Sequence, residues 1–356
     1  MSDAEPQISV VIPAYQSAPY LADTLTALGV AVSRAGVRAE VIVVDDGSTD
    51  DTAAVVADAT EGFPGEVRLR RQSNRGRFLA RWLGLSTARA PLVLLLDSRV
   101  LIGADALSSV LAARHDAPAG IAWNAHVVTD PSAPLIGLFW EAPTYAFWGR
   151  YLRRPRQFDL TPENFDAAPK GTTMFLAEIG ALREAFEHAW PEADARLVSD
   201  DTKVLRHLAG TAGIRIDPAF RALYRPRTSV RRFVRHTFDR GTLFVDSYAG
   251  TTPARSIVLV AFAISPVVVG ALLVLFGAAG AAALAGIALL SVGGLLSVAA
   301  RNGCPPRGLL AFVCWLPVFA PTFWAGVVRG VVLHRRAFRR ARGATPVASD
   351  LSGRRG

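Results

Sequence analysis

Two short apolar runs constrain the fold of this chain more than any other feature. Residues 8–15 read ISVVIPAY and residues 41–50 read VIVVDDGSTD, so each β-branched run stops abruptly at polar, turn-forming residues. Such runs suit buried strands of a parallel sheet, and in open α/β sheets ligands bind just beyond the carboxyl ends of the strands. Two adjacent carboxylates there can accept hydrogen bonds from a base or a ribose, and the following glycine lets the backbone approach a ligand closely. We therefore expect a binding crevice at these strand ends.

The residues around these runs alternate between helical and strand patterns. Leu21, Leu25, Leu28 and Val32 recur at helical spacing and predict an amphipathic helix that covers the sheet. Further helices are expected at 52–59, 75–88, 181–189 and 197–209, and further strands at 67–70, 92–96 and 171–177. This β-α-β-α-β order predicts a parallel sheet with right-handed crossovers.

The last third of the chain has the composition of a membrane region. Apolar residues make up 51% of the sequence, and stretches at 256–276, 280–300 and 309–333 are each long enough for a span of ~20 residues. The link between the second and third stretches carries Arg301 and Arg307, and the tail after the third stretch is basic at 335–342. Basic segments of this kind are typical of the cytoplasmic side. Because Pro317 and Pro321 interrupt helical hydrogen bonding, we expect two full spans and a re-entrant or interfacial third element. Three ordinary spans are the alternative.

The net charge of +9 is explained by arginines near this membrane region. They cluster at 225–240 and 335–342, a placement that favours anionic lipid headgroups and a polyanionic leaving group over nucleic acid. Residues 229–244 interleave arginines with apolar residues, as a helix lying on a membrane surface does. The two cysteines, Cys304 and Cys314, both fall in the apolar region and give no disulfide framework. Residues 1–7 show no signal-peptide pattern, so the first domain is expected in the cytoplasm.

Together, the motifs at 8–15 and 41–50 resemble the start of a family 2 glycosyltransferase, with the resemblance spanning roughly residues 8–241. The resemblance implies an α/β GT-A fold, a Rossmann-like and mostly parallel sheet, followed by an α-helical membrane region. The expected segments are a cytoplasmic GT-A domain at 1–225, a basic interfacial linker at 226–255, a transmembrane region at 256–333 and a basic tail at 334–356.

The same resemblance assigns a nucleotide pocket. The ring of Tyr15 would stack near the base, and the backbone of Pro13 and Ala14 would hold its edge. Asp45 and Asp46 would accept hydrogen bonds from the base or ribose. The remaining contacts to nucleotide or phosphate would come from Arg75, Arg81, Asp97 and Ser98. Ordinary packing and surface roles for Tyr15 and Arg81 are the alternative.

One position departs from the family pattern. The family usually ends its third strand with Asp-x-Asp, whose last carboxylate holds a divalent metal, whereas this chain has Asp97-Ser98-Arg99. A hard cation needs oxygen ligands, which a guanidinium does not offer. Either Arg99 neutralises the diphosphate in place of Mn²⁺ or Mg²⁺, or Asp97 still binds the metal, or catalysis has been lost. We expect metal-independent or weakly metal-dependent transfer.

The resemblance also places the acid–base chemistry. Asp201 stands where the family has its catalytic base, with Asp200 in the place of the preceding Glu, and a simple helix-capping role is the alternative. Gly171, Thr172 and Thr173 would lie under the donor sugar or the acceptor. Arg235 and Arg240 would close on the diphosphate, unless they are solvated charges facing the membrane.

These inferences predict a multi-pass enzyme of the plasma membrane that faces the cytoplasm. It would move a sugar, with inversion, from a UDP-linked donor to a hydroxyl of a lipid-linked or cell-envelope glycan. Its expected partners are the donor, that acceptor and membrane lipids, without nucleic acid. Alternatives are a polyprenyl-phosphate sugar transferase and an inactive scaffold of a glycan-assembly complex. Residues 123–157, rich in proline, aromatic residues and arginine, are either an irregular aromatic core segment or an acceptor-side lid at the membrane interface.

Overall fold

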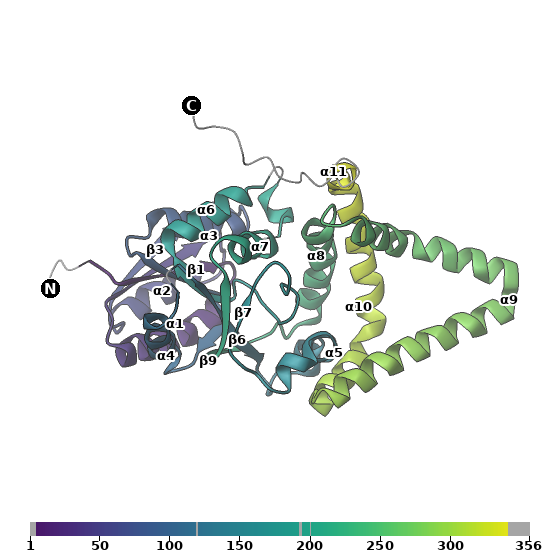
Figure 1. Ribbon diagram of the computed structural model, residues 1–356, viewed down its shortest axis with the longest axis horizontal. Coiled ribbons are helices and arrows are strands. Elements are labelled where there is room, and N and C mark those ends of the chain that lie inside the picture. The colour runs from purple at the N-terminus through teal and green to yellow at the C-terminus, as the bar shows by residue number, and fades with distance from the viewer. Residues whose placement is uncertain (1–4, 119, 192–193, 200, 341–356) are drawn as a thin grey trace. The chain divides into compact units, whose positions relative to one another are not determined.

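The computed structural model describes residues 5–118, 120–191, 194–199 and 201–340, which divide into two compact units (Figure 1). The first unit comprises Met1–Val230 and Gly293–Trp315, and the second comprises Arg231–Val292 and Leu316–Gly356. Each unit is described by itself.

The first unit is built on a mixed sheet, which contains nine strands among the described residues. Its order is β3-β2-β1-β4-β8-β6-β9-β5, and β7 pairs with β9. The first four strands in the chain run parallel: β1 (Ile8–Ala14), β2 (Ala39–Asp45), β3 (Glu66–Arg71) and β4 (Leu92–Leu96). Every residue of β1, β2 and β4 is buried. Their sequences are largely apolar, as expected for parallel strands covered on both faces, and the buried Ser9 hydroxyl of β1 donates to Glu40 of β2.

The other half of the sheet mixes directions. It consists of β5 (Val100–Ile102), β6 (Ala122–Thr129), β7 (Phe158–Leu160), β8 (Met174–Glu178) and β9 (Ile214–Tyr224). Strand β8 is antiparallel to β4 and β6, β6 is parallel to β9, and β5 and β7 are antiparallel to β9. The predicted α/β class is confirmed, while the parallel pairing is concentrated in the first four strands.

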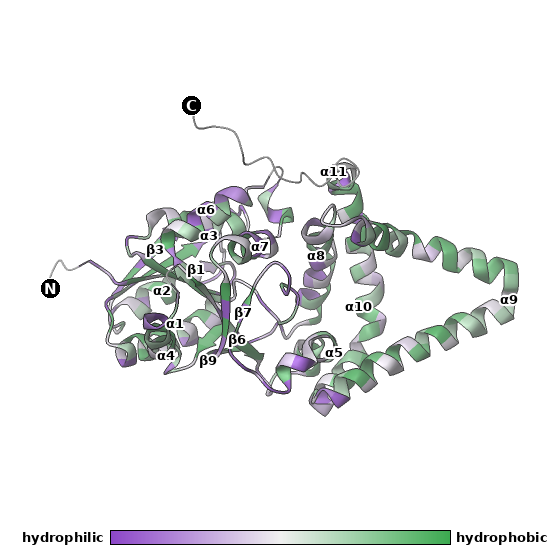
Figure 2. Cartoon of the chain, in the orientation of Figure 1, coloured by the Kyte–Doolittle hydropathy of each residue, from purple (hydrophilic) through white to green (hydrophobic). Residues whose placement is uncertain are grey.

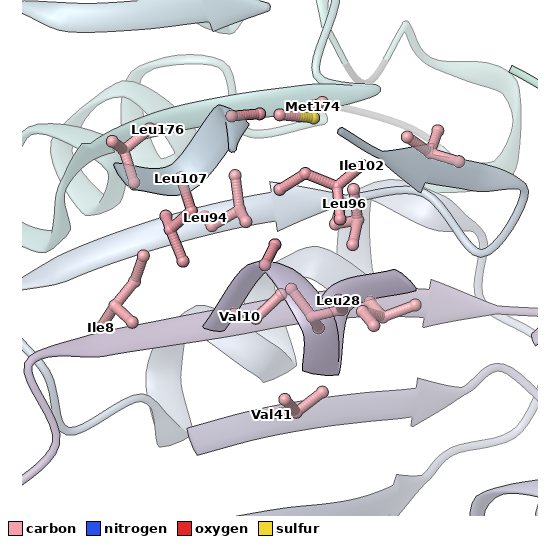
Figure 3. Close-up of a cluster of buried hydrophobic side chains, with 14 of the residues drawn as sticks. Ile8, Val10, Leu28, Val41, Leu94, Leu96, Ile102, Leu107, Met174 and Leu176 are labelled. Atoms are coloured by element: carbon pink, nitrogen blue, oxygen red, sulfur yellow. The ribbon is translucent and has the colours of Figure 1, made fainter. Parts of the chain in front are cut away.

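Helices cover both faces of this sheet. One face carries α1 (Ala18–Ala35), α2 (Thr52–Thr60) and α4 (Ala106–His115), and the other carries α3 (Arg77–Thr87), α6 (Ile179–His188) and α7 (Thr202–Thr211). Figure 3 shows Val10, Leu94 and Leu176 of the sheet facing Leu28 of α1 and Leu107 of α4, all of them buried. The predicted helical stripe of α1 is confirmed, since all four of its apolar positions are buried. The unit is a three-layer α/β/α domain.

The aromatic segment 123–157 contains regular structure in place of the irregular core segment considered from the sequence. It begins with β6 and continues with η1 (Leu135–Leu138) and α5 (Glu141–Leu152), which is kinked at Trp148. Pro143 lies in the first turn of α5, where a missing N–H costs no intrahelical bond, so this proline fits the start of the helix.

Two long apolar helices, α9 (Pro253–Arg301) and α10 (Pro306–Leu333), are long and apolar enough to cross a membrane; Figure 2 colours most of both as hydrophobic. Helix α9 has 49 residues and is broken at Gly277, where φ is 51° and ψ is −127°. This break separates the stretches predicted at 256–276 and 280–300. Helix α10 is continuous through Pro317 and Pro321, so the break expected there is wrong. Apolar helices tolerate proline where packing absorbs the local distortion.

The second unit packs α10 against α8 (Val230–Tyr248) and ends in α11 (Arg335–Arg340). Small residues form the contact: a Cβ added at Gly326 would overlap the Phe238 carbonyl, and one at Gly330 would lie 2.7 Å from Val245 Cγ2. The Thr242 hydroxyl donates to the Gly326 carbonyl at 3.1 Å. Glycines spaced in this way let two helix backbones approach closely.

Candidate active site

Hydrogen bonds join the loops that follow three neighbouring parallel strands. The Ser17 amide donates to the Thr52 hydroxyl at 2.9 Å, and the Ser17 and Ser98 hydroxyls are 2.9 Å apart. Ser17 follows β1, Thr52 begins α2 after β2, and Ser98 follows β4. The expected polar rim at the carboxyl ends of the strands is therefore present. Within it, Pro13 and Ala14 end β1 in buried positions, whereas the side chain of Tyr15 is 45% exposed and open to a stacking partner.

Asp45 and Asp46 are buried and organise the neighbouring loops. Asp45 Oδ1 accepts from the Ser48 amide at 2.8 Å, and its Oδ2 accepts from Arg71 Nε at 3.1 Å. Asp46 accepts from the amides of Arg75 and Gly76 at 2.8 and 2.9 Å.

A carboxylate has about four acceptor sites, so these bonds use much of the capacity predicted for a base or ribose. The glycine after this pair also has a role within the chain. A Cβ on Gly47 would lie 2.8 Å from the Asn74 amide nitrogen, so the close approach there is to the protein's own backbone.

Arg81 lies in the core beneath the end of β4. Its side chain is 1% exposed, and Nη2 donates to Asp97 Oδ1 at 2.7 Å. The Asp97 amide donates to the Thr173 carbonyl at 2.9 Å, which brings the segment 171–173 to the same strand end. Arg81 thus neutralises Asp97 and holds it in place, and the basic groups open to a ligand lie elsewhere.

Arg99 is held by contacts other than the predicted diphosphate. Its guanidinium carbon lies 4.0 Å from the ring centroid of Tyr20, and Nη1 donates to the Arg225 carbonyl at 3.5 Å. The Arg225 amide in turn donates to the Arg99 carbonyl at 3.0 Å. A cation stacked on an aromatic face in this way is stabilised where it is.

An open hollow of about 470 Å³ lies beside the loop at 74–76. Arg75 and Arg196 supply its basic groups, and Trp190, 47% exposed, supplies an aromatic wall. The full lining consists of Asn74, Arg75, Leu79, Trp190, Pro191, Asp194, Ala195 and Arg196. Arg196 and Trp190 are not among the residues predicted from the sequence. Arg196 belongs to the short helix η2 (Ala195–Leu197) and approaches Gly76 from a segment 120 positions later, a proximity that no local motif signals.

The predicted base and the predicted sugar-binding segment lie close together. Asp201 Oδ1 accepts from the hydroxyls of Ser199 and Thr202 at 2.9 and 3.0 Å. Its Oδ2 and the Thr173 hydroxyl lie 3.8 and 3.6 Å from the point where a Cβ of Gly171 would be, so the three residues adjoin one another. The Gly171 amide donates to Asn124 Oδ1 at 3.0 Å. Asp200 lies outside the described residues.

Lys170 was not predicted, although it adjoins the predicted segment. Burial lowers the pKa of its ammonium group, while the charges of Asp166 and Asp201 act in the opposite direction. Its Nζ lies 3.3 Å from Asp166 Oδ1 and 4.1 Å from the centre of the Phe165 ring. A cation is thus held within electrostatic reach of Asp201.

The side chains around Asp97 are a poor fit to a protein-held divalent metal. Arg81 already occupies Asp97 Oδ1, and the Ser98 hydroxyl is bonded to Ser17. Among the described residues, no three His, Cys, Asp or Glu side chains gather as a metal-binding group. Metal dependence remains a prediction. Arg235 and Arg240 belong to α8 in the second unit, and their predicted contact with the diphosphate also remains a prediction.

Comparison with known proteins gives a consistent family for this domain. Residues 9–179 match the family described as Glycosyl transferase family 2. The succinoglycan biosynthesis protein ExoO of Rhizobium meliloti is 34% identical over 141 residues, 39% of each chain. An undecaprenyl-phosphate 4-deoxy-4-formamido-L-arabinose transferase of Klebsiella pneumoniae is 31% identical over 93 residues, 26% of this chain and 28% of the relative. This chain therefore spans well under half the length of the curated relatives that it matches.

Among solved structures, the mannosyltransferase PcManGT of Pyrobaculum calidifontis, in complex with GDP-Man and Mn²⁺, aligns with a TM-score of 0.49 and 19% identity. The alignment covers 92% of this chain and 88% of that one.

Proposed function

We propose, from the match of residues 9–179 to the family described as Glycosyl transferase family 2, that the protein transfers a sugar from a UDP-linked donor to a hydroxyl of a lipid-linked or cell-envelope glycan. The transfer inverts the anomeric centre. The catalytic domain faces the cytoplasm, and α9 and α10 anchor it in the plasma membrane. The proposal extends the family assignment to a donor, an acceptor and a location.

The geometry of Asp201 is the observation that carries this proposal. In an inverting transfer a group opposite the leaving diphosphate must take the proton of the acceptor hydroxyl. Two hydroxyl donors hold Asp201 Oδ1, and Oδ2 lies 3.8 Å from the point that a Cβ on Gly171 would occupy, beside the segment expected under the sugar. A carboxylate that is held through one oxygen beside that segment suits a general base.

The donor side is supported by the rim of strand ends and by the adjoining hollow. The exposed ring of Tyr15 offers a stacking surface for a base, and the hollow beside residues 74–76 offers Arg75 to phosphate groups, while Arg196 in the same lining is paired with Asp194. Guanidinium groups suit phosphate oxygens because they donate in pairs. Because Asp97 is already neutralised by Arg81, we expect Arg75 to offset part of the diphosphate charge in the absence of added metal.

The test uses the full chain purified in detergent. Donor binding is measured by calorimetry with UDP-, GDP- and CMP-sugars, each with a chelator and with Mn²⁺, and transfer is measured with membranes of the expressing cells as the acceptor source. We expect Asp201→Asn to keep donor affinity within a few-fold and to lower the transfer rate at least a hundredfold. Loss of donor binding in the wild type under both conditions would overturn the proposal.

A polyprenyl-phosphate acceptor is the second candidate, and the similarity to the undecaprenyl-phosphate transferase favours it. A phosphate acceptor is already ionised and needs no base. Under this alternative Asp201→Asn retains most of the activity, and mild acid releases the sugar from the lipid product. Under the main proposal the variant is inactive, and mild acid leaves the transferred sugar attached to its acceptor glycan.

A further inference from the structure

The end of α5 carries a concentrated positive charge that the glycosyltransferase chemistry does not use. Arg150, Arg153, Arg154 and Arg156 are all exposed, and with Pro155 they line an open hollow of about 900 Å³. We refer to these four residues as the α5 arginine cluster. Arg150 lies in the last turn of α5, and the other three follow within four residues of its end.

The charges of this cluster are not compensated within the described part of the chain. No ion pair or side-chain hydrogen bond joins any of the four guanidinium groups to the residues that the structure describes. Elsewhere in the same unit exposed arginines have acidic partners, such as Arg34 with Asp105 and Arg196 with Asp194. Four like charges around one hollow repel one another, and an anion placed among them removes that repulsion. Guanidinium groups are particularly suited to phosphate.

Exposed aromatic residues adjoin the cluster. The side chain of Phe147 is 78% exposed, and its ring centre lies 6.5 Å from that of Trp148. Trp148 Nε1 donates to the Asp166 carbonyl at 3.0 Å, which fixes the indole. Aromatic rings beside arginines are the combination that favours the boundary between lipid headgroups and acyl chains.

Helix α5 and the residues just before it contact the link between the two apolar helices and the start of α10. Asn302 Nδ2 donates to the Tyr145 carbonyl at 2.8 Å, and the Phe312 ring stacks on Phe139, with centres 5.3 Å apart. Arg307 Nη2 donates to the Ala133 carbonyl at 2.9 Å. All of these residues belong to the first unit, so α5 is attached to the point where α9 ends and α10 begins. If α9 and α10 enter a bilayer, α5 lies at its surface.

From these observations we propose that the α5 arginine cluster binds the phosphate groups of anionic phospholipids at the membrane surface. The phosphates enter the hollow between the guanidinium groups, while Phe147 inserts at the level of the headgroups. This contact does not depend on the proposed sugar transfer. It adds a specific lipid requirement to an anchor otherwise made of apolar helices.

The experiment titrates the full chain in neutral detergent with dihexanoyl phosphatidylglycerol, dihexanoyl phosphatidylcholine and inorganic phosphate, followed by microscale thermophoresis. The variant is the triple substitution Arg153→Gln, Arg154→Gln and Arg156→Gln. The matched control is the triple substitution Arg34→Gln, Arg38→Gln and Arg70→Gln. It removes the same charge from exposed positions on α1, on the link between α1 and β2, and on β3. A third variant, Arg153→Lys, Arg154→Lys and Arg156→Lys, retains the charge. The unfolding temperatures of all variants are measured to show that each one is folded.

We expect the wild type to prefer phosphatidylglycerol, and the triple Gln variant to bind it at least tenfold more weakly, while the control triple and the Lys variant stay within about threefold. An equal loss in the control triple would overturn the proposal, because general charge would then explain the binding. Inorganic phosphate binding as tightly as the lipid would overturn it as well, since the site would be one for free anions. UDP-sugar binding, measured on the same samples, reports separately on the proposed function.

Discussion

At the scale of single residues, Arg81 connects the site to the core. Its guanidinium is nearly inaccessible and bonds Asp97, which is 18% exposed at the end of β4. Removing one partner of a buried pair leaves the other charge without compensation. The pair therefore contributes both to folding and to the electrostatics of the strand ends.

We predict that Arg81→Met destabilises the protein by about 3–5 kcal/mol, since Asp97 keeps a charge that nothing balances. For a domain of this size that corresponds to a fall of roughly 6 °C or more in the unfolding temperature. The measurement is thermal unfolding of the full chain in detergent. Arg34→Met, which breaks an exposed pair with Asp105, is the control and should cost less than about 1 kcal/mol. Equal losses in the two variants would contradict the buried-pair argument.

How far the site could be predicted also differs residue by residue. The family resemblance predicts that Asp201 and Gly171 lie in one site, and in the structure Asp201 Oδ2 lies 3.8 Å from the Cβ position on Gly171. The stacking of Arg99 on Tyr20 could not be predicted, because it depends on the direction in which a side chain leaves a strand end. The same is true of Arg196, which reaches the loop at 74–76 only because the chain folds back after α6.

At the scale of elements, the contact between α5 and the residues around Cys304 contains a buried acid. Burial raises the pKa of the Glu141 carboxyl, although a hydrogen bond with Thr129 acts in the opposite direction. A Cβ on Gly308 would lie 2.7 Å from Glu141 Cβ, so the two segments are in direct contact. Burial together with the Glu141 charge also raises the pKa of the Cys304 thiol to about 12.

We predict that this contact weakens as pH rises. Because the folded-state pKa of Glu141 is raised above 4.5, its contribution is fully present below about pH 4.5 and is lost as pH rises through the folded value. Thermal unfolding of wild type and Glu141→Gln should therefore be followed from pH 4 to pH 8. The wild type should lose stability relative to the variant with increasing pH. A constant difference across this range would show that the carboxyl does not titrate in the contact.

The packing of α8 on α10 gives a second prediction for an element. A side chain at Gly326 must push the Phe238 backbone away, so Gly326→Val should cost about 1–3 kcal/mol or more. Gly286→Val on α9 is the matched control, since nothing lies within 4 Å of a Cβ there. The unfolding temperatures of the two variants in detergent are compared. A Gly326→Val protein as stable as the control would mean that the two helices are not held by this contact.

The elements missed by sequence analysis have a physical reason. Strand β9 contains Pro218, and a proline within a run argues against a strand. The structure accommodates it with an irregularity: the pairing of β6 and β9 shifts register, with Ala125 opposite Asp217 and His126 opposite Arg221. By contrast, β1, β2 and β4 could be predicted because burial on both faces leaves largely apolar, β-branched runs.

At the scale of the whole molecule, membrane topology follows from three local observations. The break at Gly277 divides the 49 residues of α9 into two halves, each longer than the ~20 residues needed for a span. Such a helical pair returns the chain to the side from which it started. The link after α9 belongs to the same compact unit as the sheet, which agrees with that return.

The placement of α10 determines on which side of the membrane the carboxyl terminus lies. It runs alongside the arginine-rich α8 for several turns, since Phe238 faces Gly326 and Val245 faces Gly330. Just after α10, His334 Nδ1 lies 3.5 Å from Asp246 Oδ1 of α8. Amphipathic helices with arginine on one face lie in the membrane surface. A helix packed lengthwise on α8 would share that orientation, and on this ground we expect α10 to rest in the interface, although it is long and apolar enough to cross the bilayer.

We therefore predict that the carboxyl terminus lies on the same side of the membrane as the sheet. A green fluorescent protein fused after residue 356 should be fluorescent in a bacterial host, and alkaline phosphatase at the same position should be inactive. Phosphatase inserted at Gly277, between the two halves of α9, is the control and should be active because that break lies on the far side. Active phosphatase at the carboxyl terminus would make α10 a third crossing, and its packing on α8 would then require α8 to be tilted into the bilayer.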